Sequence, residues 1–194
     1  MPNPNPDPNP NPHAWKILSE KLILDRPPWL RVYEQDVQLP DGRIITDYLR
    51  AEAPAYVAIF GVQPDGLIVA IEEYKHGPGR VVLKVPAGIM EPGEDAQEAA
   101  RRELLEETGY EAETWQLLAV THDDGNRGMS VGYHFLATGL RQVAEPDAGD
   151  LAEVRPLLMT PVELRRALYD GRVGTTGAAA SIMFGLCALA EPDS

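Results

Sequence analysis

The stretch that decides the fold is residues 88–110, GIMEPGEDAQEAARRELLEETGY. It holds six acidic residues in its middle fourteen, beside a proline-glycine turn and a glycine near each end. Asp95, followed three residues later by Glu98, resembles a capping box, and both acids suit the positive end of a helix dipole. Gly109 is a natural residue to follow a helix, because glycine readily adopts a left-handed conformation. The pattern predicts a helix over residues 96–108.

Three glutamates fall on the same side of that helix as its alanines. At about 100° per residue, with Glu103 at zero, Glu107 lies near about 40° and Glu106 near about 300°. Like charges three or four residues apart repel, and partial burial strengthens the repulsion. A divalent cation removes it, and oxygen-rich, histidine-free ligation selects Mg²⁺ or Mn²⁺. The alternative is a solvated, charge-rich surface helix, and the helical wheel alone leaves both interpretations open.

Charge and cysteine content limit the classes of partner. The net charge is −13, which disfavours a nucleic-acid partner but permits a small anionic substrate beside a bound cation. The single cysteine, Cys187, cannot form an intrachain disulfide, which fits a reducing cytoplasm. The N-terminus lacks the basic and apolar regions of a signal peptide, and the apolar run 178–190 is too short to span a bilayer. We therefore expect a cytoplasmic protein with neither a nucleic-acid nor a membrane partner.

The chain divides into three segments by composition. Residues 1–14 form a tail, since the first twelve contain six prolines alternating with Asn or Asp. Residues 15–50 read as strands, with a Pro40-Asp41-Gly42 turn between two β-rich runs. Residues 51–194 contain the remaining strands and all the expected helices. The main domain is therefore expected to span residues 51–194.

The main domain begins with strands and ends with helices. The strand candidates are AYVAIFGV, LIVAIEEY, RVVLKVP, WQLLAV, SVGYHFLATGL and EVRPLLM. Thr160, Pro161 and Glu163 form a capping box that starts a helix, with Gly171 as its stop, and a small-residue helix over 178–190 follows. Strands, one central helix and late helices predict an α+β fold with a mixed, mainly antiparallel sheet.

The fixed positions of the Nudix box all occur in the opening stretch at the spacing of that motif: Gly88, Glu94, Arg102, Glu103, Leu104, Glu106, Glu107, Gly109 and Tyr110. The chain thus resembles the Nudix hydrolases, which implies an α/β/α sandwich around a mixed sheet. The segments LPDGRIITDYL and EYKHGPGRVVLKVPAGIMEPGE are similar to the ADP-ribose pyrophosphatase branch. That resemblance implies additional N-terminal antiparallel strands that contribute to a domain-swapped homodimer.

Metal ligation is expected from the box carboxylates. Glu103 and Glu107 are the first-choice ligands for Mg²⁺ or Mn²⁺, supported by Glu106 and the backbone at Ala87. Glu94 either reaches the metal through water or serves the loop.

Arg102 is expected to orient the carboxylates. At four-residue spacing it can pair with Glu106 or Glu98. The sequence leaves the identity of the general base open. The resemblance implies an acid on a late loop, matched approximately by Asp150, and the alternatives are Glu107 or Glu106.

Substrate-binding candidates come from four places in the sequence. Trp29 is a candidate to stack on a nucleobase from the partner subunit, with plain strand packing as the alternative. Lys75 and Arg80 are candidates to contact phosphates, with ordinary surface charge as the alternative. Gly88 completes the set.

The resemblance implies Mg²⁺-dependent hydrolysis of ADP-ribose or a related nucleoside diphosphate sugar to a nucleoside monophosphate and a sugar phosphate. Two alternatives remain. One is a Nudix hydrolase of dinucleoside polyphosphates or modified nucleoside triphosphates. The other is a non-catalytic module that senses a nucleotide sugar.

Overall fold

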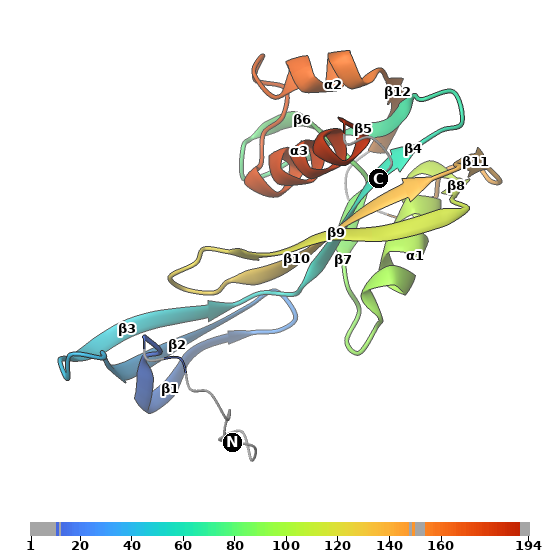
Figure 1. Cartoon of the computed structure of the whole chain (residues 1–194). Helices are drawn as coiled ribbons and strands as arrows, with labels where there is room; N and C mark the ends of the chain where they lie inside the picture. The colour runs from blue at the N-terminus through green and yellow to red at the C-terminus, as the bar shows by residue number, and fades with distance from the viewer. Residues whose placement is uncertain (1–10, 12, 148, 150–153, 191–194) are drawn as a thin grey trace. The chain divides into compact units, whose positions relative to one another are not determined.

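The computed structural model of the chain describes residues 11, 13–147, 149 and 154–190. These residues form two compact units. The first contains the described residues up to Pro54 together with Asp124–Met129, and the second contains Ala55–Asp123 and the described residues from Ser130 onward. Figure 1 shows the elements of each unit, which are taken separately below.

The first unit is a three-stranded antiparallel sheet in the order β1-β2-β3 (Figure 1). Its strands are β1 (Lys16–Arg26), β2 (Leu30–Gln38) and β3 (Ile44–Glu52). The turn between β2 and β3 lies where the Pro40-Asp41-Gly42 sequence predicts it, and Gly42 has the positive φ of 87° that favours glycine.

The second unit is built on a seven-stranded sheet whose central order is β12-β5-β4-β10-β9, with β6 on β5 and β7 on β4. Strand β10 runs parallel to β4 and the other pairs are antiparallel, so the predicted mixed sheet is confirmed. A separate pair is formed by β8 and β11. The strands are β4 (Tyr56–Val62), β5 (Ile68–Lys75), β6 (Arg80–Lys84), β7 (Ala87–Ile89), β8 (Tyr110–Glu111), β9 (Thr114–Asp123), β10 (Ser130–Thr138), β11 (Arg141–Gln142) and β12 (Val154–Met159).

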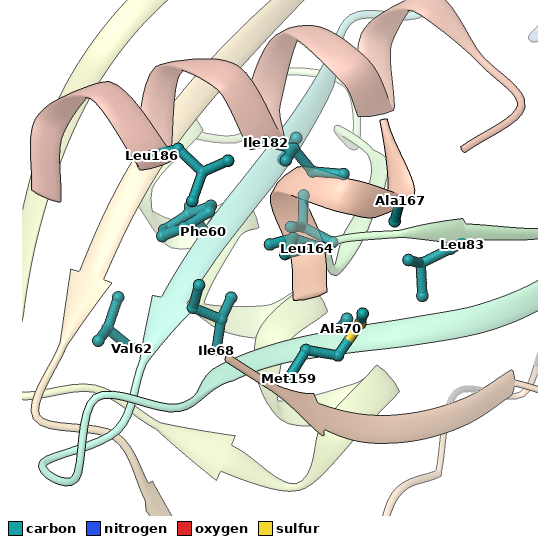
Figure 2. Close-up of a cluster of buried hydrophobic side chains, with 12 residues drawn as sticks. Phe60, Val62, Ile68, Ala70, Leu83, Met159, Leu164, Ala167, Ile182 and Leu186 are labelled. Atoms are coloured by element: carbon teal, nitrogen blue, oxygen red, sulfur yellow. The ribbon is translucent and has the colours of Figure 1, made fainter. Parts of the chain in front are cut away.

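Helices cover both faces of this sheet, which confirms the α/β/α sandwich (Figure 1). Alternate residues of β4 point to opposite faces, as the period of a strand requires. Val57 and Ile59 pack in the cluster that contains α1 (Ala96–Thr108). Phe60 packs with Leu164 and Ile182, from α2 (Pro161–Ala167) and α3 (Thr176–Ala190), as Figure 2 shows.

The central helix has the bounds that the sequence predicts. The Asp95 carboxylate accepts hydrogen bonds from the backbone N–H groups of Gln97 and Glu98, which caps the start of α1. At the other end Gly109 adopts a φ of 73° and donates its N–H to the carbonyl of Leu105. Local sequence signals alone are therefore enough to define α1.

The two later helices differ from their predicted bounds. The Thr160 capping box is present, but α2 ends at Ala167 rather than near Gly171, because the next two N–H groups bond to carbonyls only three residues back. Helix α3 begins at Thr176, two residues before the predicted start, with Gly177 inside its first turn. Packing against the sheet holds this glycine in the helix despite its low propensity.

The packing of α3 on β4 generates a stability prediction. A Cβ added at Gly185 would lie 2.0 Å from the ring of Phe60, which is buried in the same core. We expect Gly185→Ala to lower the free energy of unfolding by about 1–3 kcal/mol, because overpacking outweighs the better helix propensity of alanine.

Urea denaturation measures this change. Gly77→Ala is the matched control, since a Cβ there meets no atom within 4 Å and should leave the free energy of unfolding nearly unchanged. A Gly185→Ala protein as stable as the wild type would contradict the close approach of α3 to β4.

Candidate active site

A carboxylate of α1 lies directly against β7 because position 88 has no side chain. A Cβ built on Gly88 would lie 2.1 Å from the carboxyl carbon of Glu103. No other residue type leaves that space, so Gly88 allows the helix carboxylate to approach the strand backbone. Gly88 and Glu103 therefore lie side by side in the fold.

Glu107 is the most deeply buried carboxylate of the cluster, with 3% of its surface exposed. Its Oε2 accepts a 2.8 Å hydrogen bond from the backbone N–H of Ala87, and its Oε1 accepts a 2.9 Å hydrogen bond from Lys84 Nζ. Burial raises the pKa of Glu107 above its ordinary value, although the charge and hydrogen bond of Lys84 act in the opposite direction. Glu107 is therefore a carboxylate that one ammonium neutralises incompletely.

Lys84 is a buried cation at the end of β6. Its Nζ donates a 3.0 Å hydrogen bond to the carbonyl of Ala87 and lies 3.0 Å from Oε2 of Glu73. Burial acts to lower the pKa of Lys84, but the charges of Glu107 and Glu73 outweigh it and raise the pKa, so the side chain stays an ammonium ion. One ammonium thus serves two buried carboxylates.

Glu73 is shared between two lysines. Burial acts to raise the pKa of its carboxyl, but the hydrogen bond from Lys75 and the charge of Lys84 outweigh burial and lower it. The contact of Glu73 Oε2 with Lys84 is an ion pair, and this buried oxygen accepts no hydrogen bond from the described residues. A buried carboxylate oxygen without a hydrogen-bond donor is uncommon, and here the charge of Lys84 at 3.0 Å compensates it.

Arg102 connects the remaining acids of the cluster. Its Nε and Nη2 donate 3.0 Å hydrogen bonds to the two oxygens of Glu94, and its Nη1 donates to Glu103 at 2.6 Å and to Glu106 at 3.2 Å. The predicted pair with Glu106 is confirmed, whereas Glu98 lies 4.0 Å from Arg101 instead. The Arg102 hydrogen bonds hold the pKa of Glu94 below its ordinary value.

Glu106 differs from the expectation that all three box glutamates share the alanine side of the helix. The Glu106 side chain is 43% exposed, while that of Glu103 is 12% exposed. The helical wheel placed Glu106 at the edge of the side that was expected to be buried, and in the fold the side chain at this edge faces solvent.

A cavity of about 300 Å³ adjoins this cluster within the second unit. Its wall on the cluster side includes Lys75, Lys84 and Gly88, and Tyr56 with Asp123 contributes to its other side. The hydroxyl of Tyr56 is 3.4 Å from the Asp123 carboxylate. Cationic, aromatic and backbone groups therefore meet in one concave surface, as is usual for small-molecule sites.

The chemistry of the cluster fits a hard divalent cation. Ion pairs connect five carboxyl groups, those of Glu73, Glu94, Glu103, Glu106 and Glu107, with only three cations, so the acids outnumber the cations by two. In the part of the chain that the structure describes, no three acidic, histidine or cysteine side chains converge on one point, because Lys84 and Arg102 attract them. The carboxylate oxygens of the cluster are donors of the type that binds a hard divalent cation, and in the structure they pair with side-chain cations.

The other predicted site residues are dispersed. Arg80 is exposed and donates weakly to the carbonyls of Val81 and Arg172, outside the described cavity lining. Trp29 is 67% exposed in the first unit. Asp150 lies outside the described residues, although the acidic segment preceding it is tied to α1 by a 2.8 Å hydrogen bond from the N–H of Asp147 to the carbonyl of Glu106.

Sequence reasoning missed Lys84 and its partner Glu73. The signal was present, because Lys84 is the one charged residue within the apolar run VVLKV. Lysine is almost never fully buried unless it is paired, so a lysine in such a run predicts a buried carboxylate partner. The sequence could not identify the partners of Lys84, since Glu73 and Glu107 lie on other elements.

The described part of the chain contains no helix long and apolar enough to cross a membrane.

Comparison with known proteins gives consistent matches. Residues 52–175 match the NUDIX domain model, and residues 15–48 match the model of the nucleoside diphosphate sugar hydrolase N-terminal domain. The chain is 39% identical over 114 residues to the ADP-ribose pyrophosphatase of Mycobacterium tuberculosis, covering 58% of this chain but only 54% of that protein. It is 29% identical over 161 residues to the ADP-ribose pyrophosphatase of Bacillus subtilis, covering 81% of this chain and 86% of that protein.

A solved structure, described as the crystal structure of an ADP compounds hydrolase, aligns with a TM-score of 0.78. The alignment covers 93% of this chain and 97% of that one at 20% identity, which shows a shared fold. Because the NUDIX domain model covers well over half of the chain and the box carboxylates cluster on α1 as described, the chain belongs to the Nudix hydrolase family.

Proposed function

We propose that this protein is a divalent-metal-dependent pyrophosphatase that cleaves ADP-ribose or a related nucleoside diphosphate sugar to a nucleoside monophosphate and a sugar phosphate. The observation that carries the proposal is a cluster of five carboxylates and three cations, built around α1, beside a cavity bordered by Lys75 and Tyr56. The names of the Mycobacterium and Bacillus relatives and the match to a nucleoside diphosphate sugar hydrolase N-terminal domain support this substrate class.

Glu103 and Glu107 are the proposed principal ligands of Mg²⁺ or Mn²⁺, with Glu106 reaching the ion from the exposed edge of α1. Glu94 and the carbonyl of Ala87 are secondary candidates, since Arg102 and Lys84 respectively occupy them. When bound, such an ion neutralises charge on phosphate oxygens and lowers the pKa of a water molecule.

The side chains of the chain itself position the reacting groups. Arg102 contacts three carboxylates at once and therefore holds Glu103 and Glu106 in fixed directions. Lys75 borders the cavity and is proposed to contact the substrate phosphates, with Gly88 offering close approach to the strand backbone. Arg80 is proposed to assist from the cavity's surroundings, and Trp29 is proposed to stack on a nucleobase from the partner subunit.

A general base must accept a proton from the attacking water. Asp150 is one proposed base, supported by the attachment of the neighbouring acidic segment to Glu106. Glu106 is the alternative, since it is exposed and still within the cluster. Glu107 is the third, because burial raises its pKa to about 7, which suits a group that exchanges protons near neutrality.

A homodimer located in the cytoplasm is also proposed. Many large apolar side chains on the first unit's sheet are exposed, among them Ile17, Leu22, Ile23 and Ile44. A three-stranded sheet gains stability when such side chains are covered, and a second copy of the chain would cover them.

Hydrolysis assays test the proposed substrate. We expect AMP release from ADP-ribose in Mg²⁺ and none in EDTA. The other substrates to assay are GDP-mannose, a diadenosine polyphosphate and a nucleoside triphosphate. Cleavage of one of these compounds instead would be consistent with the acidic site but would replace ADP-ribose as the proposed substrate. Equilibrium binding of ADP-ribose without turnover of any compound would favour the nucleotide-sugar-sensing module.

Replacing one carboxylate tests the role of α1. Glu107→Gln keeps the side-chain volume and one of the two accepted hydrogen bonds, and Lys84 keeps its ion pair with Glu73, so the fold should persist, while the kcat falls by about 10²–10³-fold or more. Glu98→Gln is the matched control, since Glu98 lies on the same helix with 71% of its side chain exposed. Comparable kcat values for the two variants would remove Glu107 from the catalytic machinery.

Light scattering at micromolar concentration tests the dimer. We expect the mass of two chains, and a shift toward one chain when Ile17→Glu and Leu22→Glu place charges on the exposed β1. A wild-type protein that scatters as a single chain would contradict the proposed assembly.

A further inference from the structure

The ammonium of Lys84 is surrounded by oxygen atoms from three other elements. Its Nζ lies 2.9 Å from Oε1 of Glu107 on α1, 3.0 Å from the carbonyl oxygen of Ala87 on β7 and 3.0 Å from Oε2 of Glu73 on β5. The first two contacts are hydrogen bonds that the ammonium donates, and the contact with Glu73 is an ion pair. These contacts form an oxygen set centred on a cation that the chain itself provides.

The same set would otherwise suit a metal ion. Two carboxylate oxygens and a backbone carbonyl are hard donors of the type that bind Mg²⁺ or Mn²⁺. Two of these three groups, Glu107 and Ala87, are also among the metal-ligand candidates. The Lys84 ammonium therefore places a positive charge among these oxygens where a metal ion would otherwise place one, with one unit of charge instead of two.

Lys84 has little freedom to leave this place. It is 6% exposed and its neighbours Leu83 and Val85 are fully buried, so the strand backbone fixes the direction of the side chain. The register of β6 on β5 places Lys84 opposite Ile71, two residues from Glu73 on the same strand. Removing a buried ammonium from its carboxylates would leave charges uncompensated, which is costly in a protein interior.

We propose that Lys84 is a positioning residue that permanently takes the place of one divalent cation, so that this site binds one metal ion fewer than the same site without the lysine. Glu107 Oε1 then stays with Lys84, and Oε2, which also accepts the N–H of Ala87, is the oxygen that would bind the divalent ion together with Glu103. This inference rests on the proposed metal-dependent function, and it concerns the number of ions rather than the reaction.

Metal counting tests the proposal. Mn²⁺ bound per chain is measured by equilibrium dialysis and elemental analysis in the wild type and in Lys84→Met, which keeps an unbranched side chain as far as Cε but lacks the charged Nζ. We expect one additional Mn²⁺ per chain in Lys84→Met. Lys75→Met is the matched control, because Lys75 also pairs with Glu73 but does not contact Glu107 or Ala87, and its Mn²⁺ count should equal that of the wild type.

The outcomes separate this inference from the proposed function. Equal Mn²⁺ counts in the wild type and Lys84→Met would overturn the inference while leaving a metal-dependent enzyme. A wild type that binds no Mn²⁺ at all would instead contradict the proposed function.

If Lys84→Met does not fold, a measurement on the wild type tests whether a metal ion displaces the Lys84 ammonium. Reductive methylation followed by mass spectrometry reports whether each lysine is accessible. We expect Lys84 to remain unmodified with and without saturating Mg²⁺, while the half-exposed Lys75 reacts in both. Methylation of Lys84 that begins only when Mg²⁺ is added would show that the metal displaces the ammonium, and would overturn the proposal.

Discussion

The structure of the second unit depends on compensating buried charge where α1 meets β6 and β7. Lys84 and Glu107 are both nearly inaccessible to solvent and compensate each other's charge at 2.9 Å, with Glu73 as a second ion-pair partner of Lys84. That single pair fixes the end of β6 to the C-terminal half of α1. The carbonyl and N–H of Ala87 complete the same cluster, so the chain between the two strands is held as well.

Small residues make this arrangement sterically feasible. Ala99 and Ala100 are fully buried, which lets α1 lie close to the sheet, and Gly88 leaves room for the carboxylate of Glu103. The acids of α1 therefore differ in exposure, from the buried Glu107 to the more exposed Glu106. A gradient from protected to solvated carboxylates suits a site that must hold a cation and still exchange water and substrate.

Sequence reasoning predicted those features whose causes are local. The bounds of α1 follow from Asp95 and Gly109, and the glutamate cluster follows from helical spacing. The end of α2 and the start of α3 were misplaced, because backbone tightening and packing on the sheet decide them. The Lys84 ion pairs join this residue to Glu73 on β5 and to Glu107 on α1, two elements that local sequence signals do not connect with β6, so only the fold could identify them.

The central claim is that the carboxylates of α1 hold a divalent cation beside the Lys84 ammonium. Anomalous diffraction from crystals soaked in Mn²⁺ tests it most directly. The account predicts a Mn²⁺ peak within coordination distance, about 2.2 Å, of Glu103 and Glu107 oxygens, with Lys84 still bonded to Glu107 and Ala87. A Mn²⁺ peak away from α1, or one on the site of the Lys84 ammonium with that side chain displaced, would contradict it.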